Sequence, residues 1–278
     1  MREEFVERLI KFYIPLFIFL FVLLFPFYWM FITAFKSDME LYNLKLNPFV
    51  IHQPTLHNIY VLFKETLFNQ WMINTFFVAL LATFISLAAS LMAAYAIQRL
   101  RFRTSGAMGI SIFFSYLVPP TILFIPLATI IFEVRLWDSL WSLVLVYPTF
   151  LIPFCTWLLM GYFKSIPKEM EECAMIDGAS RFRVFWQIVV PLALPGILSS
   201  AIFAFTLSWN EFLYALTFIS TNTQKTVPVG LITELVRGDV YHWGPLMTGA
   251  LLASVPVALV YSFFVEHYVA GMTGALKE

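Results

Sequence analysis

Six apolar stretches, each long enough to cross a lipid bilayer, run through this chain of 278 residues. A transmembrane helix needs about 20 apolar residues. Lipid leaves no external partner for the backbone, so apolar runs without alternation indicate helices rather than barrel strands. Only 12% of the residues are charged, against about 25% in a soluble domain. The sequence therefore predicts an all-α, polytopic membrane protein in contact with lipid, with spans at Phe12–Phe35, Trp71–Ile97, Gly109–Phe132, Leu140–Phe163, Leu194–Ser220 and Met247–Tyr268.

The sequence lacks the features of several other classes of protein. The net charge is zero, which argues against a nucleic-acid partner. Cys155 and Cys173 form neither a disulfide framework nor metal-ligand spacing. His52 and His57 are interpreted as solvated loop histidines rather than a metal site. No G-x-x-x-x-G-K-[ST] phosphate-binding loop occurs. We therefore expect no catalytic residue, no metal, no bound cofactor and no ATP hydrolysis by this chain.

Lysine and arginine set the expected orientation. The first span is too long for a cleavable signal peptide and has no small-residue cleavage site. With the N-terminus inside, 11 of the 17 basic residues fall in cytoplasmic segments and 6 in the longer outer segments. The positive-inside rule then places both termini, and the segment between the fourth and fifth spans, in the cytoplasm. Outside, TLHNIYVLFKETLF predicts a short helix at the membrane surface.

The cytoplasmic segment EECAMIDGASRFRVFWQIVVPLALPG combines charge with turn signals. Three acids follow Pro167, which favours a helix start, and Gly178 stands where a helix ends in a left-handed residue. Ser180 is placed to cap a second helix, and Pro191 to end it because proline lacks the N–H of the helical ladder. We predict two short amphipathic helices joined by a tight turn. Their predicted apolar faces are Ile166, Met170, Cys173 and Ala174 in the first helix and Phe182, Phe185, Trp186 and Val189 in the second.

Two alternatives compete for this segment. A DNA-binding helix-turn-helix is disfavoured because no basic recognition face is present. An amphipathic helix that lies passively in the lipid headgroups fits the pattern better. The small residues Cys173 and Ala174 beside acids nevertheless favour docking, because they let another backbone approach closely. We therefore expect a rigid, convex knob that inserts into a cleft of a partner protein.

The segment resembles the EAA loop of ABC-importer permease subunits, in which E-A-A is followed by three residues, G, nine residues and I-x-L-P. The matching positions here are Glu172, Cys173, Ala174, Gly178, Ile188, Val190 and Pro191. Cysteine at 173 and valine at 190 depart conservatively from alanine and leucine. The resemblance covers nearly the whole chain, including LVPPTILFIPLATIIF and LSWNEFLYALTF, and is to the carbohydrate branch, the smaller permease of a maltose-type or glycerol-phosphate-type importer. The tail departs from the branch at Glu266 and His267.

The resemblance implies the type I ABC importer permease fold in a bacterial or archaeal cytoplasmic (inner) membrane. Residues 1–70 would form the N-terminal tail, first helix and outer loop, and 71–278 the core permease domain with a coupling loop at 165–191. The implied partners are a second permease, an ATPase dimer that binds ATP–Mg, and an extracytoplasmic solute-binding protein that delivers a sugar or sugar-like solute. The implied ATPase-coupling residues are Glu171, Glu172, Cys173, Ala174, Asp177, Gly178, Ala179, Ile188 and Pro191.

Polar residues within the predicted spans are candidates for the substrate pathway. Glu211 is foremost among them because an ionisable group at membrane depth indicates function. The alternatives are that Glu211 lies at the outer interface, where a charge costs little, or that it braces a neighbouring helix. Prolines in the third and fourth spans remove helical hydrogen bonds and predict kinks or cavity-lining positions: Pro119, Pro120, Pro126, Pro148 and Pro153. The pathway candidates are Asn74, Tyr116, Thr121, Ser208, Trp209, Asn210, Glu211 and Tyr214.

A self-sufficient secondary transporter is the alternative function. Such a protein requires coupling ions and, in many folds, paired inverted repeats. The sequence shows no convincing repeat, and Glu211 is its one plausible ion-coupling acid. A sensor or assembly scaffold, which needs no translocation path, is a third class. The sequence favours a transport subunit that is not itself an enzyme.

Overall fold

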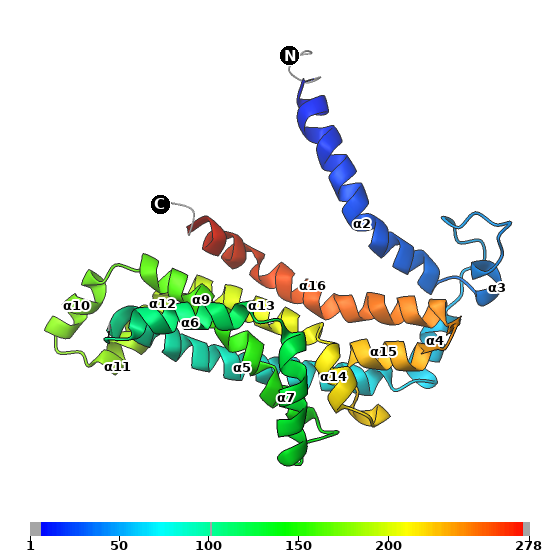
Figure 1. Cartoon of the computed structure of the whole chain (residues 1–278). Helices are drawn as coiled ribbons and strands as arrows, with labels where there is room; N and C mark the ends of the chain where they lie inside the picture. Colours follow the sequence, from blue (N-terminus) through cyan, green and yellow to red (C-terminus); the bar gives the residue numbers. More distant parts are fainter. Residues whose placement is uncertain (1–6, 101, 275–278) are drawn as a thin grey trace. The chain divides into compact units, whose positions relative to one another are not determined.

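The regular structure of this protein is almost wholly helical (Figure 1). The computed structural model describes residues 7–100 and 102–274. In this part of the chain two short strands, β1 (Val236–Arg237) and β2 (Val240–Tyr241), pair antiparallel with Val236 opposite Tyr241. The chain forms two compact units: one from the chain up to Asn69 with Gly230–Val255, the other from Gln70–Val229 with the chain from Pro256 onward. The predicted all-α class is confirmed.

Four helical segments among the described residues are long and apolar enough to cross a membrane, and the number is six if each of two bent helix pairs counts as one span. Each of the four lies within a few residues of a predicted span. They are Leu9–Ala34, made of the π-helical turn η1 (Leu9–Tyr13) and α2 (Ile14–Ala34); Phe68–Leu100, made of α5 (Phe68–Tyr95) and η2 (Ala96–Leu100); Leu140–Ser165, made of α8 (Leu140–Val146) and α9 (Pro148–Ser165); and Trp243–Phe264 of α16 (Trp243–Gly274).

The third predicted span is not one continuous helix. α6 (Ser105–Leu117) and α7 (Pro120–Glu133) meet at 93°, and Figure 1 shows α7 crossing the direction of α6. Val118 has extended backbone, and the adjacent Pro119 and Pro120 remove two N–H donors from the ladder. Pro126 lies inside α7 without breaking it. The predicted kink is therefore confirmed at this proline pair, which divides the third predicted span into two helices.

The fifth predicted span, Leu194–Ser220, is also divided. α13 (Leu194–Trp209) ends early, and a separate α14 (Leu213–Phe218) follows after a turn. The prediction of one helix is wrong here because Glu211 caps a new helix, as described below. Before α13 the chain bends by 74° at Ala193. The helix that precedes this bend consists of α11 (Arg181–Val184), the π-helical turn η3 (Phe185–Val189) and α12 (Val190–Leu192).

Two apolar clusters organise the unit that begins at Gln70. The first surrounds α8 and α14 and includes Val78, Val144, Tyr147, Tyr214 and Phe218. The second joins α5 and α9 to the segment after α9 and includes Leu91, Phe163, Val184, Phe185 and Val189. The second cluster therefore attaches the loop at 165–191 to the membrane helices. The elements η4 (Asn222–Gln224) and α15 (Val227–Leu235) follow α14.

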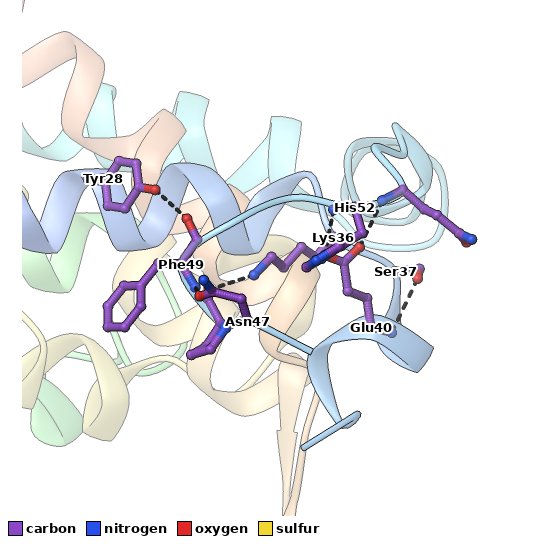
Figure 2. Close-up of polar contacts among 9 residues, drawn as sticks. Tyr28, Lys36, Ser37, Glu40, Asn47, Phe49 and His52 are labelled. Atoms are coloured by element: carbon purple, nitrogen blue, oxygen red, sulfur yellow. Dashed lines mark hydrogen bonds and ion pairs between the residues drawn. The ribbon is translucent and has the colours of Figure 1, made fainter. Parts of the chain in front are cut away.

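The segment after the first span is closed by polar contacts, which Figure 2 shows. The buried Glu40 carboxylate accepts hydrogen bonds from the backbone amides of His52 and Gln53 at 2.8 and 3.1 Å, and the His52 Nδ1 lies 3.1 Å from it. Lys36 Nζ donates to the Pro48 carbonyl at 2.6 Å. These contacts hold residues 36–53 in a compact loop. The flanking helices are α3 (Asp38–Leu41) and α4 (His57–Lys64), and α4 confirms that the segment TLHNIYVLFKETLF contains a short helix.

Candidate functional site

The loop at 165–191 contains the two predicted helices and the predicted turn. α10 (Glu169–Ile176) is followed by Gly178, whose φ of +88° lies in the left-handed region that glycine adopts without a side-chain penalty. The Ser180 Oγ accepts a hydrogen bond from the Arg183 amide at 3.4 Å and caps α11. Figure 1 shows α10 and α11 beyond the ends of α9 and α12. We call residues 169–189 the coupling knob.

Pro191 does not end the second helix, so that prediction is wrong. The helix continues to Leu192 because the π-helical turn η3 precedes the proline, and the Val190 amide bonds back to Phe185. Pro191 then takes one of the first positions of α12, where a missing N–H does little harm. π-Helical turns within helices occur frequently at functional sites.

Glu171 faces the interior of the chain rather than the outer surface of the coupling knob. Its side chain is 8% exposed, and its Oε1 lies 2.6 Å from Nε of Arg99, which is 5% exposed. The contact is an ion pair without hydrogen-bond alignment. Arg99 also donates from Nη2 to the Ile166 carbonyl at 2.7 Å, and the Tyr95 hydroxyl lies 3.4 Å from Glu171 Oε2. Glu171 therefore fastens α10 to the end of the second span, and sequence reasoning missed this partner because it used Arg99 only for orientation.

The inner side of the coupling knob is otherwise apolar. Ala174, Ala179 and Ile188 pack against the second apolar cluster, in which Val184 and Phe185 are buried. Three of the predicted coupling residues thus support the knob from inside. These three residues therefore position the knob against the membrane helices, and its outer face is formed by other residues.

The outer side of the coupling knob carries both charge and exposed apolar surface. The predicted coupling residues Glu172, Cys173, Asp177, Gly178 and Pro191 are exposed. Three apolar side chains lie there as well: Ile176, 85% exposed, Phe182, 74% exposed, and Trp186, 49% exposed. Sequence reasoning missed Ile176 altogether.

The predicted apolar faces of the knob are therefore only partly correct. Phe185 and Val189 are buried, whereas Phe182 and Trp186 point outward. In the second helix the π-helical turn adds a residue to the turn, so a 3.6-residue period does not describe which side chains share a face. Ile166 is buried, but it lies at the end of α9, before α10 begins, so it is not on the first helix as predicted; Met170 and Cys173, which are on α10, are exposed.

Asn74 has a structural role, because its side-chain amide is hydrogen-bonded within the chain and is not available to a substrate. It is buried, and its side-chain amide donates to the carbonyls of Thr223 and Lys225, both at 2.9 Å. It also accepts from Gln70 Nε2 at 3.0 Å. Asn74 therefore ties η4 and the chain after it to α5. Its partners lie about 150 residues away in sequence, which is why its spacing gave no sign of this role.

Glu211 caps α14. Its carboxylate accepts hydrogen bonds from the Tyr214 amide at 2.9 Å, the Ala215 amide at 3.1 Å and the Tyr147 hydroxyl at 2.8 Å. The buried Tyr214 then donates from its hydroxyl to the Pro120 carbonyl at 2.7 Å. The turn that divides the fifth span is thereby connected to the proline pair that bends the third span. Among the alternatives considered for Glu211, bracing a neighbouring helix fits this geometry.

The remaining pathway candidates do not converge on one cavity. Ser208 and Trp209 are buried in α13, whereas Asn210 is exposed. Tyr116 and Thr121 are exposed on α6 and α7, on the two sides of the bend. The structure therefore brings Glu211 and Tyr214 together and leaves the other candidates apart.

Asp138 joins the turn before α8 to the turn after α14, a contact that sequence reasoning missed. It accepts hydrogen bonds from the Ser220 amide at 2.8 Å and the Thr221 amide at 2.9 Å, and from the Thr221 hydroxyl. Burial alone raises the pKa of Asp138, but these hydrogen bonds outweigh it and hold the pKa below its ordinary value of 3.8. Asp138 therefore links these two turns through its carboxylate, outside the membrane-spanning helices.

Comparison with known proteins gives close relatives over the whole chain. The family described as binding-protein-dependent transport system inner membrane component matches residues 85–274. The sulfoquinovosyl glycerol transport system permease protein SmoH of Agrobacterium fabrum is 36% identical over 254 residues, 91% of this chain and 88% of that protein. The trehalose/maltose transport system permease protein MalG of Thermococcus litoralis is 32% identical, covering 100% of this chain and 99% of that protein. A bacterial ABC transporter involved in alginate import contains a chain of the same fold, with a TM-score of 0.82, 19% identity and coverage of 96% of this chain and 98% of that one.

The bent spans and the helical knob, together with these relatives, define a multi-pass permease of the ABC importer class. The chain belongs to the family of binding-protein-dependent transport system inner membrane components, within a group of sugar-transport permeases. The predicted resemblance to carbohydrate ABC importer permeases is confirmed. Because this family consists of transport subunits, the alternative of a self-sufficient secondary transporter is set aside.

Proposed function

We propose that this chain is one of two permease subunits of an ATP-driven importer for a sugar or sugar-like solute, in the cytoplasmic membrane of a bacterium or archaeon. The coupling knob is the observation that carries the proposal. Its inner side is fixed by the Arg99–Glu171 ion pair and an apolar cluster. Its outer side presents Glu172 and Asp177 beside exposed Ile176. A surface with both acids and apolar groups, held rigidly at one end of the helices, is suited to docking on a protein.

The proposed partners divide the work of transport. A separate ATPase dimer binds ATP–Mg and takes the outer side of the coupling knob, and this chain binds no cofactor. A second permease completes the pathway. An extracytoplasmic solute-binding protein delivers the solute, as the name of the family supports. In this assembly the chain carries out no covalent chemistry. It contributes binding surfaces for its partners and transmembrane helices that line the pathway and move during transport.

The proposed mechanism is rigid-body coupling. Nucleotide binding favours the closed form of the ATPase dimer, and the coupling knob transmits this preference because it moves with the helices to which it is attached. The Arg99–Glu171 pair and the Tyr95–Phe185 ring contact connect the knob to the second span, and the second apolar cluster connects it to the fourth. The bends at Pro119–Pro120 and Ala193 are the points at which the attached helices change direction.

The proposed substrate class is a saccharide or glycoside. Relatives of this chain are named for trehalose/maltose, diacetylchitobiose and sulfoquinovosyl glycerol transport. Tyr116, Thr121 and Asn210 offer an exposed aromatic ring, hydroxyl groups and an amide within the spans. These groups suit a polyhydroxylated solute, and we propose them as the pathway residues of this chain. We assign Ser208, Trp209 and Tyr214 to support of the helices around them.

The test uses the intact complex. The complex is purified from its native membrane through a tag on this chain, its co-purifying chains are identified, and uptake of labelled maltose, trehalose and diacetylchitobiose is measured in proteoliposomes with ATP inside. We expect a permease, an ATPase and a solute-binding protein, and uptake that requires ATP. Gly178→Leu should reduce uptake per ATP hydrolysed while leaving membrane insertion intact. Gly161→Ala, at a helical glycine with open space around it, is the matched control. Unchanged uptake in Gly178→Leu, or transport by this chain alone, would contradict the proposal.

A further inference from the structure

A cavity of about 700 Å³ lies between η2, the start of α6 and the end of α9. This is the end of the helices that leads into the coupling knob. Gly106 leaves it open, because a Cβ built there meets no atom within 4 Å. The cavity is separate from the outer side of the knob: Glu172, Asp177 and Ile176 are not among its lining residues.

Positive charge gathers on the wall of this cavity. Arg99, Lys164 and Lys168 all line it, and none of its described lining residues is acidic. The Arg99 charge is offset by Glu171. The two lysines have no ion-pair partner within the part of the chain that the structure describes. The cavity therefore offers two uncompensated ammonium groups to an anion.

The cavity is polar at one end and apolar at the other. α6 begins with Ser105 at the cavity and reaches Phe113 two turns later, and α9 places Trp157 seven residues before Lys164. At 1.5 Å per residue, each helix separates its polar and aromatic residues by about 10 Å. The rings of Phe113 and Trp157 are 5.7 Å apart. The apolar end therefore points into the hydrocarbon depth of the span, and the cationic end points toward the cytoplasmic face given by the positive-inside rule.

We propose that this cavity binds an anionic phospholipid of the cytoplasmic leaflet. Its phosphate group would meet Lys164 and Lys168, its ester region would meet Ser105, and an acyl chain would follow Phe113 and Trp157. A zwitterionic lipid is disfavoured because no lining carboxylate is present to pair with its amine. Basic pockets between membrane helices on the cytoplasmic side recognise such headgroups. The proposal concerns a ligand of the permease itself and does not depend on transport.

The test measures lipid retention by the full-length chain, purified in detergent, by native mass spectrometry. The probes are dioleoyl-phosphatidylglycerol and dioleoyl-phosphatidylethanolamine, which share acyl chains and differ in charge. We expect selective retention of phosphatidylglycerol. The double variant Lys164→Gln/Lys168→Gln should weaken this binding by about 30-fold, since each basic residue near an anionic headgroup contributes a factor of about five. Lys45→Gln/Lys64→Gln, which removes the same charge from the outer segments, should leave binding unchanged.

A second variant tests the cavity without changing charge. Gly106→Leu fills open space in α6 and should lower retention of phosphatidylglycerol while the helical circular dichroism signal stays unchanged. Equal retention of the two lipids, or undiminished retention in the lysine variant, overturns the proposal. Displacement of the lipid by inorganic phosphate alone also overturns it in favour of a simple phosphate site. Loss of the lipid when a co-purified ATPase subunit binds would assign the cavity to that protein instead.

Discussion

The Tyr147 hydroxyl donates a hydrogen bond to Glu211 Oε2 across 2.8 Å and joins the start of α9 to the turn between α13 and α14. The same carboxylate accepts the amides of Tyr214 and Ala215. The Glu211 carboxylate thus accepts three hydrogen bonds and caps α14. This arrangement explains how an acidic residue can lie in an apolar stretch of sequence and divide it into two helices.

Removal of the Glu211 carboxylate should destabilise the protein. In Glu211→Ala the Tyr147 hydroxyl and the Tyr214 and Ala215 amides lose their acceptor, so we expect the free energy of unfolding to fall by about 3 kcal/mol. The measurement is unfolding by SDS titration in mixed micelles. Asn210→Ala, at the exposed neighbouring position, should have little effect. Equal stability of the two variants would show that Glu211 is not a structural cap.

Two adjacent glutamates of the coupling knob should behave in opposite ways. Glu171→Gln leaves Arg99 buried without its counter-charge and should lower the free energy of unfolding by about 3 kcal/mol. Glu172→Gln changes an exposed side chain and should leave stability unchanged while reducing uptake per ATP hydrolysed in the reconstituted complex. Unfolding titrations and paired ATPase and uptake assays separate the two roles. A stability loss in Glu172→Gln as large as that in Glu171→Gln would refute the division into inner and outer sides.

Gly178 should be sensitive to backbone conformation rather than to crowding. A Cβ at this position meets no atom within 4 Å, but the φ of +88° penalises any L side chain. We expect Gly178→Ala to lower the free energy of unfolding by about 1 kcal/mol, and Gly178→Asn to lower it less because asparagine tolerates the left-handed region. Gly161→Ala, inside α9, should be neutral or stabilising. If Gly178→Asn were more destabilising than Gly178→Ala, backbone strain at the left-handed φ would not be the cause of the lost stability.

The outer loop should lose stability in acid through Glu40. Burial raises the pKa of Glu40, but hydrogen bonds from the His52 and Gln53 amides and the His52 ring, together with the charge of Lys36, outweigh it, and the pKa lies below its ordinary value of 4.5. Because the folded state lowers this pKa, the carboxylate stabilises the fold above the unfolded-state value and ceases to do so as the pH falls through the folded-state value. Figure 2 shows the contacts concerned.

The measurement compares wild type with Glu40→Gln. The difference in their free energies of unfolding should be largest at neutral pH and should shrink as the pH falls below 4.5. Glu65→Gln, at an exposed acid of the same unit, is the control and should show no such dependence. If the difference in free energy of unfolding between wild type and Glu40→Gln stayed constant with pH, protonation of Glu40 would not be the cause of the loss of stability in acid.

Features with a local cause were predictable from the sequence. The spans follow from the length of apolar runs, and the left-handed turn at Gly178 and the cap at Ser180 follow from the chemistry of single residues. Prolines gave a partial answer. Pro119 and Pro120 break the third span, Pro148 follows the turn at Tyr147 that separates α8 from α9, and Pro126 and Pro153 lie inside helices. A pair of adjacent prolines removes two neighbouring donors, whereas the effect of a single proline depends on the contacts around it.

Features that depend on distant partners were not predictable. Glu211 meets Tyr147 across 64 residues, and Asn74 meets Lys225 across 151. No spacing rule links such positions, so both were treated as substrate candidates. Glu171 was grouped with the exposed Glu172 for the same reason, since its partner Arg99 comes from another span. Burial of a polar residue by its own chain is the information that the sequence alone does not contain.

The fastening of the coupling knob by Arg99 and Glu171 has a consequence for the kinetics of assembly. A knob that is already fixed loses little conformational entropy when the proposed ATPase arrives, so association resembles the encounter of two preformed surfaces. Its rate constant is then set by orientation and by steering from exposed acids such as Asp177, and its heat-capacity change by the area buried rather than by coupled folding. Permease and ATPase subunits prepared separately should therefore recombine quickly on mixing, without a slow refolding phase.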